Sequence, residues 1–254
     1  MAVSTRLLGE VEVYVDGRAL DLGHALQRHV LGVLLADANT VVTIDRLLDR
    51  VWGDQRSPGS RSTVYSYVSR LRRALAPAPG ITLRRRSGGY LLEADTSVSD
   101  LHTLRAAFAG IRAGTPDGDL LRRALDLWGG DPLPALDSAW ADELRHTARQ
   151  QRLAVMHAHA DLALAAGEHD RIAATLALQV TENPLSERLT AQYMLAAHRT
   201  GRRTEALAHY DRFRRHLAEA LGIDPCHELR RLHQLILAGD RATGGPSRTD
   251  AYGS

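Results

Sequence analysis

The sequence predicts an α+β N-terminal winged helix-turn-helix domain followed by an all-α, tetratricopeptide-like helical domain. Three observations lead to this fold class. Strand patterns frame helical segments within residues 1–95, these strand patterns stop beyond residue 95, and two similar helical segments recur 34 residues apart later in the chain. We therefore expect domains at 1–95 and 96–238, followed by a disordered, Gly/Ser/Thr-rich tail at 239–254.

Composition indicates a globular chain outside the membrane. Of 254 residues, 44% are hydrophobic and 24% are charged, and no apolar run is long enough to cross a bilayer. The first residues lack the pattern of a signal peptide, and Cys226, as the single cysteine, cannot form an internal disulfide. These features predict a cytoplasmic protein with no membrane partner.

The N-terminal pattern is strand, helix, strand, helix. The segment "RLLGEVEVYVDGRALDL" alternates apolar and polar residues around an Asp16-Gly17 turn signal, which predicts a small antiparallel sheet. A helical segment, "HALQRHVLGVLLADAN", and a short β-branched run, "TVVT", follow. The segment "IDRLLDRVWG" then predicts a helix with Thr43 as N-cap and Gly53 after its last turn.

Basic charge is concentrated in one stretch. The chain contains no lysine, and a G+C-rich genome alone explains a preference for arginine. Between Gln55 and Leu92, however, eight arginines stand without one acidic residue. Clustering of this kind is the electrostatic signature of a phosphate-binding surface, whereas a solvated face normally mixes both signs.

Part of this charge lies on a predicted helix, "RSTVYSYVSRLRRAL". Its apolar residues recur at helical spacing and predict one buried stripe, while hydroxyls and arginines occupy the remaining surface. For an isolated helix, a solvated amphipathic surface is the more common interpretation. The alternative is a helix that enters a DNA groove, because small residues allow close approach and arginine offers paired donors. The candidate DNA-contacting residues are Arg61, Ser62, Tyr65, Ser66, Ser69, Arg70, Arg72 and Arg73.

The next segment favours the DNA-binding interpretation. Pro77 and Pro79 end the helix, and "ITLRRRSGGYLLEA" predicts a β-hairpin with three arginines on its first strand. Two helices followed by a basic hairpin form the element order of a winged helix-turn-helix. Tyr90 either packs under this wing or stacks on a sugar. The candidate wing residues are Arg84, Arg85, Arg86, Ser87, Gly88 and Tyr90.

The second half of the chain is rich in Ala, Leu and Arg with helical periodicity. It predicts helices at 100–113, 117–129, 138–165, 169–181, 186–199, 203–221 and 225–238. Gly167 and Gly201 each separate two of these helices and lie 34 residues apart, which is the tetratricopeptide period. Helix-pair arrays of this type are usually scaffolds that bind protein.

These motifs together resemble a known family. The segments "VTIDRLLDRVWGD", "STVYSYVSRLRRAL" and "SGGYLL" resemble the winged helix of OmpR-type response regulators, and "LWGGDPL", "NPLSERL" and "HELRRL" resemble a bacterial transcriptional activation domain. The combination is similar to the Streptomyces antibiotic regulatory protein family, small form. This resemblance implies that Tyr65, Ser66, Ser69 and Arg70 face the DNA groove, and that Arg72 and Arg73 stand where DNA backbone contacts are usual. The place of Arg72 on the flank of the helix suits a phosphate or an intramolecular partner equally well.

No enzyme is indicated by the motifs. The twelve histidines are isolated or lie at spacings that do not chelate a metal from a helix, and nucleotide-binding and nucleophile signatures are missing. Cys226 has the character of a small packing residue. We therefore predict no catalytic residue, no cofactor and no metal.

The resemblance implies a transcriptional activator of an antibiotic or secondary-metabolite gene cluster in the bacterial nucleoid. It would bind direct repeats near promoter −35 elements as a homodimer and recruit RNA polymerase holoenzyme, including its sigma factor. The alternative is a helical-repeat adaptor for protein interactions, with a winged helix that binds nucleic acid without specificity. The operator sequence and the regulated pathway do not follow from the residues.

Overall fold

The structure is a computed structural model that describes residues 2–239. Most of the tail predicted at 239–254 therefore lies outside the described residues. By internal contacts, the chain divides into two compact units, Met1–His159 and Ala160–Ser254. The first unit extends well beyond residue 95, so it includes two helices of the predicted second domain and most of a third. The sequence division at residue 95 stays a prediction.

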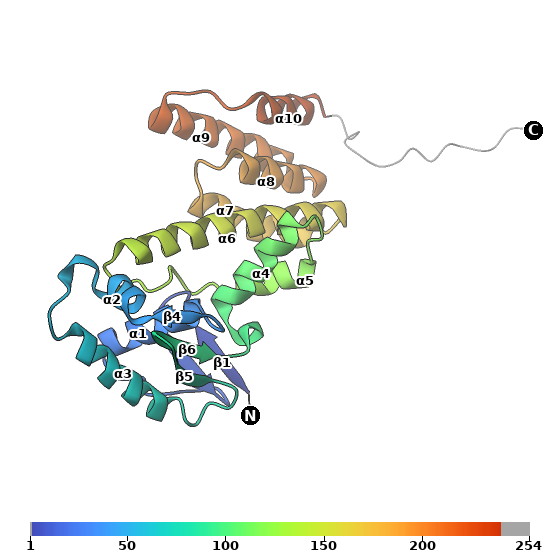
Figure 1. Ribbon diagram of the computed structural model, residues 1–254. Helices are drawn as coiled ribbons and strands as arrows, with labels where there is room; N and C mark the ends of the chain where they lie inside the picture. Colours follow the sequence, from blue (N-terminus) through green and yellow to red (C-terminus); the bar gives the residue numbers. More distant parts are fainter. Residues whose placement is uncertain (1, 240–254) are drawn as a thin grey trace, which may run out of the picture. The chain divides into compact units, whose positions relative to one another are not determined.

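The chain begins with a three-stranded antiparallel sheet of β1 (Val3–Arg6), β2 (Glu12–Val15) and β3 (Arg18–Ala19) (Figure 1). Val15 pairs with Arg18, so β2 and β3 are joined by the two residues Asp16 and Gly17. Both residues have positive φ angles, 48° and 78°, as a tight hairpin turn requires. The predicted turn is confirmed.

The winged helix-turn-helix follows. Its helices are α1 (Ala25–Ala36), α2 (Ile44–Trp52) and α3 (Ser60–Ala74), and its strands are β4 (Val41–Thr43), β5 (Thr82–Arg86) and β6 (Gly89–Glu93). The sheet order is β4-β6-β5, and both pairs are antiparallel. The predicted N-cap is confirmed, because Thr43 accepts a hydrogen bond of 3.2 Å from the backbone N–H of Arg46.

All seven helices predicted for the second half are present. They are α4 (Asp100–Arg112), α5 (Gly118–Asp126), α6 (Ala139–Ala165), α7 (His169–Glu182), α8 (Glu187–Arg199), α9 (Arg203–Leu221) and α10 (His227–Ala238). Gly167 and Gly201 have φ angles of 78° and 81° and precede α7 and α9 by the same two residues. In the second unit α8 packs against α7, α9 and α10, as in a helical-repeat array.

Within the first unit, α4 is joined to the winged helix-turn-helix by buried polar contacts. Asp100, only 2% exposed, accepts backbone hydrogen bonds of 2.9 Å from both Leu7 and Leu8 at the end of β1. Arg105 donates to the Ala36 carbonyl at 2.6 Å, and His102 Nε2 donates to the Leu35 carbonyl at 2.9 Å. Both carbonyls lie at the C-terminus of α1, where a helix leaves its last acceptors unsatisfied.

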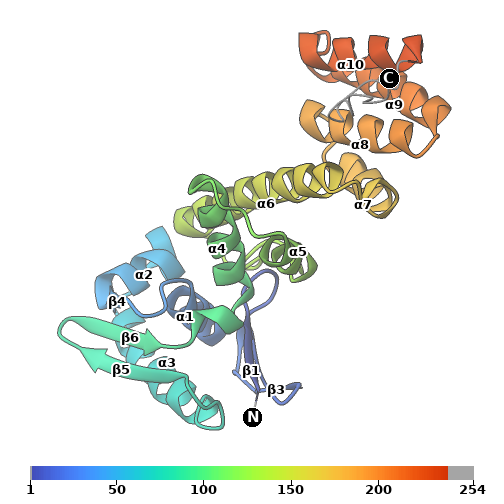
Figure 2. The ribbon, with the colours of Figure 1, turned by 90° about the vertical axis from the view of Figure 1, so that its right-hand side faces the viewer.

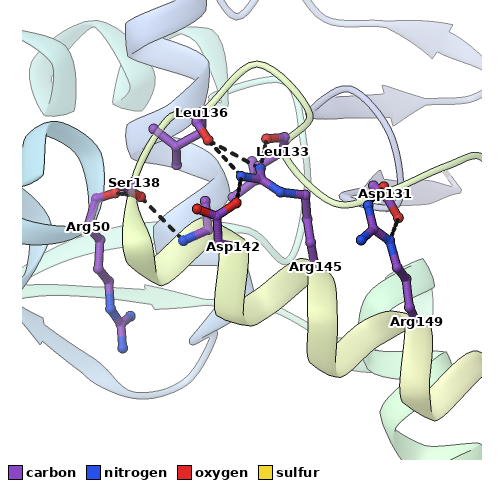
Figure 3. Close-up of polar contacts among 9 residues, drawn as sticks. Arg50, Asp131, Leu133, Leu136, Ser138, Asp142, Arg145 and Arg149 are labelled. Atoms are coloured by element: carbon purple, nitrogen blue, oxygen red, sulfur yellow. Dashed lines mark hydrogen bonds and ion pairs between the residues drawn. The ribbon is translucent and has the colours of Figure 1, made fainter.

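The segment between α5 and α6 is held in a similar way (Figure 3). Arg145 of α6 donates to the carbonyl oxygens of Leu133, at 2.8 Å, and Leu136, at 3.2 Å, and forms an ion pair with Asp142. Ser138 donates from Oγ to the carbonyl of Arg50 in α2, at 2.7 Å. The first turn of α6 is therefore attached directly to the helix that precedes α3.

The motif "LWGGDPL" has a packing explanation in this unit. Leu133 is fully buried against α1, and a Cβ atom on Gly32 would lie 2.4 Å from its Cδ2 atom. Glycine at position 32 therefore allows the loop to approach α1 closely. In residues 2–239, no helix is long and apolar enough to cross a membrane.

Candidate nucleic-acid interface

Helix α3 presents two distinct faces. Val64, Val68 and Leu71 are buried in the core of the first unit, together with Leu75 just after the helix. They fix the rotation of α3 about its axis, because their spacing places all four on one side. The remaining surface of α3, opposite this stripe and along its flanks, carries all eight candidates from the sequence, all of them exposed: Arg61, Ser62, Tyr65, Ser66, Ser69, Arg70, Arg72 and Arg73.

The loop before α3 is folded by its own hydroxyl groups. Ser60 is buried and accepts a hydrogen bond of 3.0 Å from the backbone N–H of Ser57. Ser62 and Thr63 both donate to the carbonyl of Gly59, at 2.8 and 3.0 Å. These contacts fix the first turn of α3, while Ser62 keeps lone pairs to accept a hydrogen bond from outside.

The β5–β6 hairpin lies beside α3, as both ribbon views show (Figures 1 and 2). Gly89 makes the close approach of β6 to β4 possible, since a Cβ atom there would lie 2.2 Å from the Val42 carbonyl oxygen. The Gly88 carbonyl accepts a hydrogen bond of 3.1 Å from Ile44 at the start of α2. The turn residues Ser87 and Gly88 are exposed, so the tip of the wing is available for contact.

The arginines of this surface fall into two groups. Arg61 forms an ion pair with Asp45, at 2.6 Å, and Glu93 holds both Arg84, at 2.9 Å, and Arg86, at 3.5 Å. All of these side chains are substantially exposed, so the pairs are weak and can exchange for phosphate. The second group has no ion-pair partner among residues 2–239: it comprises Arg70, Arg72, Arg73 and Arg85, of which Arg72 donates to a backbone carbonyl.

Strand register explains this division on the wing. Arg84 pairs with Leu91 and Arg86 with Gly89, so both side chains share one face of the hairpin with Glu93, whose partner is Thr82. Arg85 pairs with Tyr90 and lies on the other face, together with the buried Leu83 and Leu92. Arg85 is exposed itself, so its charge is directed to the side of the hairpin that packs on α3.

Two candidates, each with two interpretations from the sequence, make contacts within the protein. Tyr90 is only 4% exposed, so its ring packs under the wing and cannot stack on a sugar. Burial raises the pKa of its hydroxyl, and the nearby Arg85 and Arg72 oppose that shift. Arg72, expected at a backbone-contact position, donates from Nε to the Leu83 carbonyl at 2.8 Å. Its guanidinium carbon lies 5.8 Å from the centre of the Tyr90 ring.

The surface thus has the chemistry of groove binding and offers no constellation for catalysis. Hydroxyls and guanidinium groups on one exposed helix match base edges and phosphates. Across residues 2–239, no cluster of three or more His, Cys, Asp or Glu side chains is arranged to hold a metal ion.

Comparison with known proteins places this surface in a family. Residues 18–92 match the family described as "Transcriptional regulatory protein, C terminal", and residues 99–237, more than half of the chain, match "Bacterial transcriptional activator domain". The order and combination of the two are those of OmpR-type regulators that carry this helical domain. The chain belongs to the Streptomyces antibiotic regulatory protein family.

Two relatives illustrate the range of this family. The chain is 36% identical over 243 residues to the regulatory protein AfsR of Streptomyces coelicolor, which covers 93% of the chain and 24% of AfsR. It is 31% identical over 250 residues to the regulatory protein DnrI of Streptomyces peucetius, which covers 92% of each. The chain therefore spans about a quarter of AfsR and nearly all of DnrI.

A solved structure from this group shares the fold. It is titled "Mycobacterium tuberculosis EmbR in complex with low affinity phosphopeptide", and its TM-score is 0.77 at 29% sequence identity. The match covers 93% of this chain and 65% of that one. The predicted fold class is confirmed by this likeness and by the two family matches.

Sequence reasoning missed the acidic partners of this family member's interface. Glu93 directly follows the acid-free stretch 55–92 and Asp45 lies ten residues before it, so a count along that stretch includes neither. The alternation of side chains in a hairpin places Glu93 on the face of Arg84 and Arg86, and that signal was present in the sequence. The pairing of Asp45 with Arg61 depends on how α2 packs on α3 and has no local signal.

Proposed function

We propose that this chain is a sequence-specific, DNA-binding transcriptional activator. In this proposal α3 enters the major groove of double-stranded DNA and the β5–β6 hairpin contacts the sugar–phosphate backbone or the minor groove. One observation carries the proposal. The exposed face of α3 carries small hydroxyl residues together with Arg70 and Arg73, whose side chains have no ion-pair partner among the described residues. A basic hairpin lies beside this face.

Each part of the surface has a separate role in this proposal. Tyr65, Ser66, Ser69 and Arg70 lie on the exposed face of α3 and read base edges. Arg73 and Arg85 neutralise phosphates, since neither has an ion-pair partner among the described residues. The remaining contributors are Arg61, Ser62, Arg84, Arg86, Ser87 and Gly88, of which the three arginines must first exchange an acidic partner for phosphate.

Family membership supports a proposal for the target and the partners. We propose that the protein activates an antibiotic or secondary-metabolite gene cluster and binds direct repeats near promoter −35 elements as two protomers. The helical region 96–238 then contacts RNA polymerase holoenzyme, including its sigma factor. Support for this step comes from the match of residues 99–237 to a transcriptional activator domain and from the similarity to DnrI along nearly its whole length.

The test is the variant Arg70→Ala, measured against duplexes selected by the wild-type protein. A paired arginine–guanine contact contributes about 1–3 kcal/mol, so affinity falls about tenfold to a hundredfold and base preference relaxes at one position. Arg123→Ala, an exposed arginine on α5, is the matched control and leaves binding unchanged. Unchanged affinity and preference in Arg70→Ala would exclude α3 as the reading helix and favour the protein-interaction adaptor.

A further inference from the structure

We propose that Arg72 is a positioning residue that holds the recognition helix α3 against the wing, and that it does not contact DNA itself. This inference rests on the proposed function, because it concerns how the same surface is assembled. It selects one of the two interpretations of Arg72 that the sequence leaves open, an intramolecular partner in place of a phosphate.

The main contact joins two segments that are distant in sequence. Arg72 donates from Nε to the carbonyl oxygen of Leu83, at 2.8 Å. Arg72 lies in the last turn of α3, and Leu83 lies in the first half of β5. The bond therefore crosses from the helix that would enter the groove to the strand that carries the wing arginines.

The register of the hairpin leaves this carbonyl available. The turn consists of Ser87 and Gly88, and the pairs Arg86–Gly89, Arg84–Leu91 and Thr82–Glu93 follow in register. Hydrogen-bonded and non-hydrogen-bonded pairs alternate from such a turn, so Leu83–Leu92 belongs to the non-hydrogen-bonded class. The Leu83 carbonyl accordingly points away from β6, along the open edge of the sheet, and the guanidinium supplies its donor.

A second contact fixes the orientation of the same guanidinium. Its carbon lies 5.8 Å from the centre of the Tyr90 ring, within the range of a cation–π interaction. Tyr90 is buried beneath the wing. The guanidinium thus donates to the carbonyl from Nε while its carbon lies over the ring. A lysine has no Nε–H donor at that point of the side chain and carries a compact point charge in place of a planar group.

The neighbouring Arg73 provides a natural contrast. It is exposed on the same turn of α3, and its side chain has no ion-pair or hydrogen-bond partner among residues 2–239. Arg73 therefore has the properties of a phosphate contact, while Arg72 has its Nε donor engaged by the Leu83 carbonyl and its guanidinium carbon over the Tyr90 ring. The two adjacent residues carry the same charge, so they form a matched pair for experiment.

The experiment compares Arg72→Lys and Arg72→Ala with Arg73→Lys and Arg73→Ala in DNA titrations at several salt concentrations. We expect both Arg72 variants to weaken binding about tenfold, equivalent to one charged hydrogen bond, with no rescue by lysine. Arg73→Lys binds like the wild-type protein, and Arg73→Ala lowers the log–log salt slope by about 0.9. Wild-type binding by Arg72→Lys would overturn the proposal.

A double-mutant cycle that combines Arg72→Ala with Arg85→Ala distinguishes a positioning role of Arg72 from a direct contact of Arg72 with DNA. If Arg72 positions the wing, Arg85→Ala has little further effect in the Arg72→Ala background, because the wing contact is already lost. Additive losses would overturn the proposal. If the wild-type protein itself shows no salt-dependent binding to duplex DNA, that result contradicts the proposed function as a whole.

A measurement on the free protein tests the role of Arg72 whether or not the protein binds DNA. Amide hydrogen exchange of β5 and β6 in free Arg72→Lys is expected to be faster than in the wild-type protein and in Arg73→Lys. Equal exchange rates in the three proteins would show that Arg72 does not hold the wing.

Discussion

At the scale of single residues, the interface is defined by which arginines are already engaged. Arg70, Arg73 and Arg85 are available at once, whereas Arg84 and Arg86 share the carboxylate of Glu93. A count of charge along the sequence treats all of them alike. The structure instead predicts that arginines with an acidic neighbour contribute less to the free energy of DNA binding than arginines without one.

Glu93→Gln tests that grading. Removal of this carboxylate frees Arg84 and Arg86 for phosphate, so we expect tighter DNA binding and a salt slope steeper by at most about 1.8. Binding titrations over a range of salt measure both quantities. Glu143→Gln, an exposed glutamate on α6, makes the same change in net charge and is the control. Equal effects of the two variants would mean that only net charge matters.

At the scale of elements, the position of the wing depends on the contact between β6 and β4. Gly89 lies directly against the Val42 carbonyl, and the Gly88 carbonyl is bonded to the first residue of α2. Both glycines lie at the turn of the hairpin, so the hairpin that carries the basic residues is attached to β4 and α2 close to its tip. Arg85 and Ser87 remain exposed in this arrangement.

Gly89→Ala should break this arrangement. The added Cβ atom would lie 2.2 Å from a backbone oxygen, which cannot rotate away, so β4 and β6 must separate. We expect a loss of about 1–3 kcal/mol in the free energy of unfolding. Urea denaturation followed by tryptophan fluorescence measures it. Gly88→Ala is the control: its φ is strained at 75°, but nothing lies within 4 Å, so its loss should be smaller. Equal losses would show that backbone conformation alone is responsible.

The elements also show how far sequence patterns reach. Helices and the Asp16-Gly17 turn follow from periodicity and turn residues, because these signals act over a few positions. The hydrogen bonds of Asp100 could not be predicted in this way, because its carboxylate accepts from N–H groups that lie 92 and 93 residues away in the chain. Likewise the face of α3 was predictable from its apolar stripe, but the engagement of Arg72 by Leu83 depends on how a hairpin docks.

At the scale of the whole molecule, the chain consists of two compact units with different buried chemistry. The first unit joins the winged helix-turn-helix to α4, α5 and most of α6 through contacts of Asp100, Arg105 and Ser138.

The second unit is a helical array that contains a histidine with a lowered pKa. His209 packs edge-on against Tyr193, with ring centres 4.8 Å apart, and burial lowers its pKa to about 4.

The second unit should therefore lose stability in acid. The folded pKa of His209, about 4, lies below the value of 6.5 for an unperturbed histidine, so folding favours the neutral ring. The neutral His209 ring therefore makes its full contribution to the free energy of unfolding above about pH 6.5, and this contribution is lost as the pH falls towards 4. Thermal unfolding by circular dichroism across this range measures it. His209→Gln should flatten the dependence, and His216→Gln, exposed on the same helix, should not. The same pH dependence in all three proteins would contradict this role.

The central claim is that α3 and the wing bind duplex DNA by sequence. Its most direct measurement is the dissociation constant of the wild-type protein for a selected duplex and for a scrambled duplex of equal length, over a series of salt concentrations. The account predicts tighter binding to the selected duplex and, for both duplexes, a steep linear fall of log affinity with log salt, because arginines release counterions from phosphates. Equal affinity for both duplexes, or binding that does not depend on salt, would contradict it.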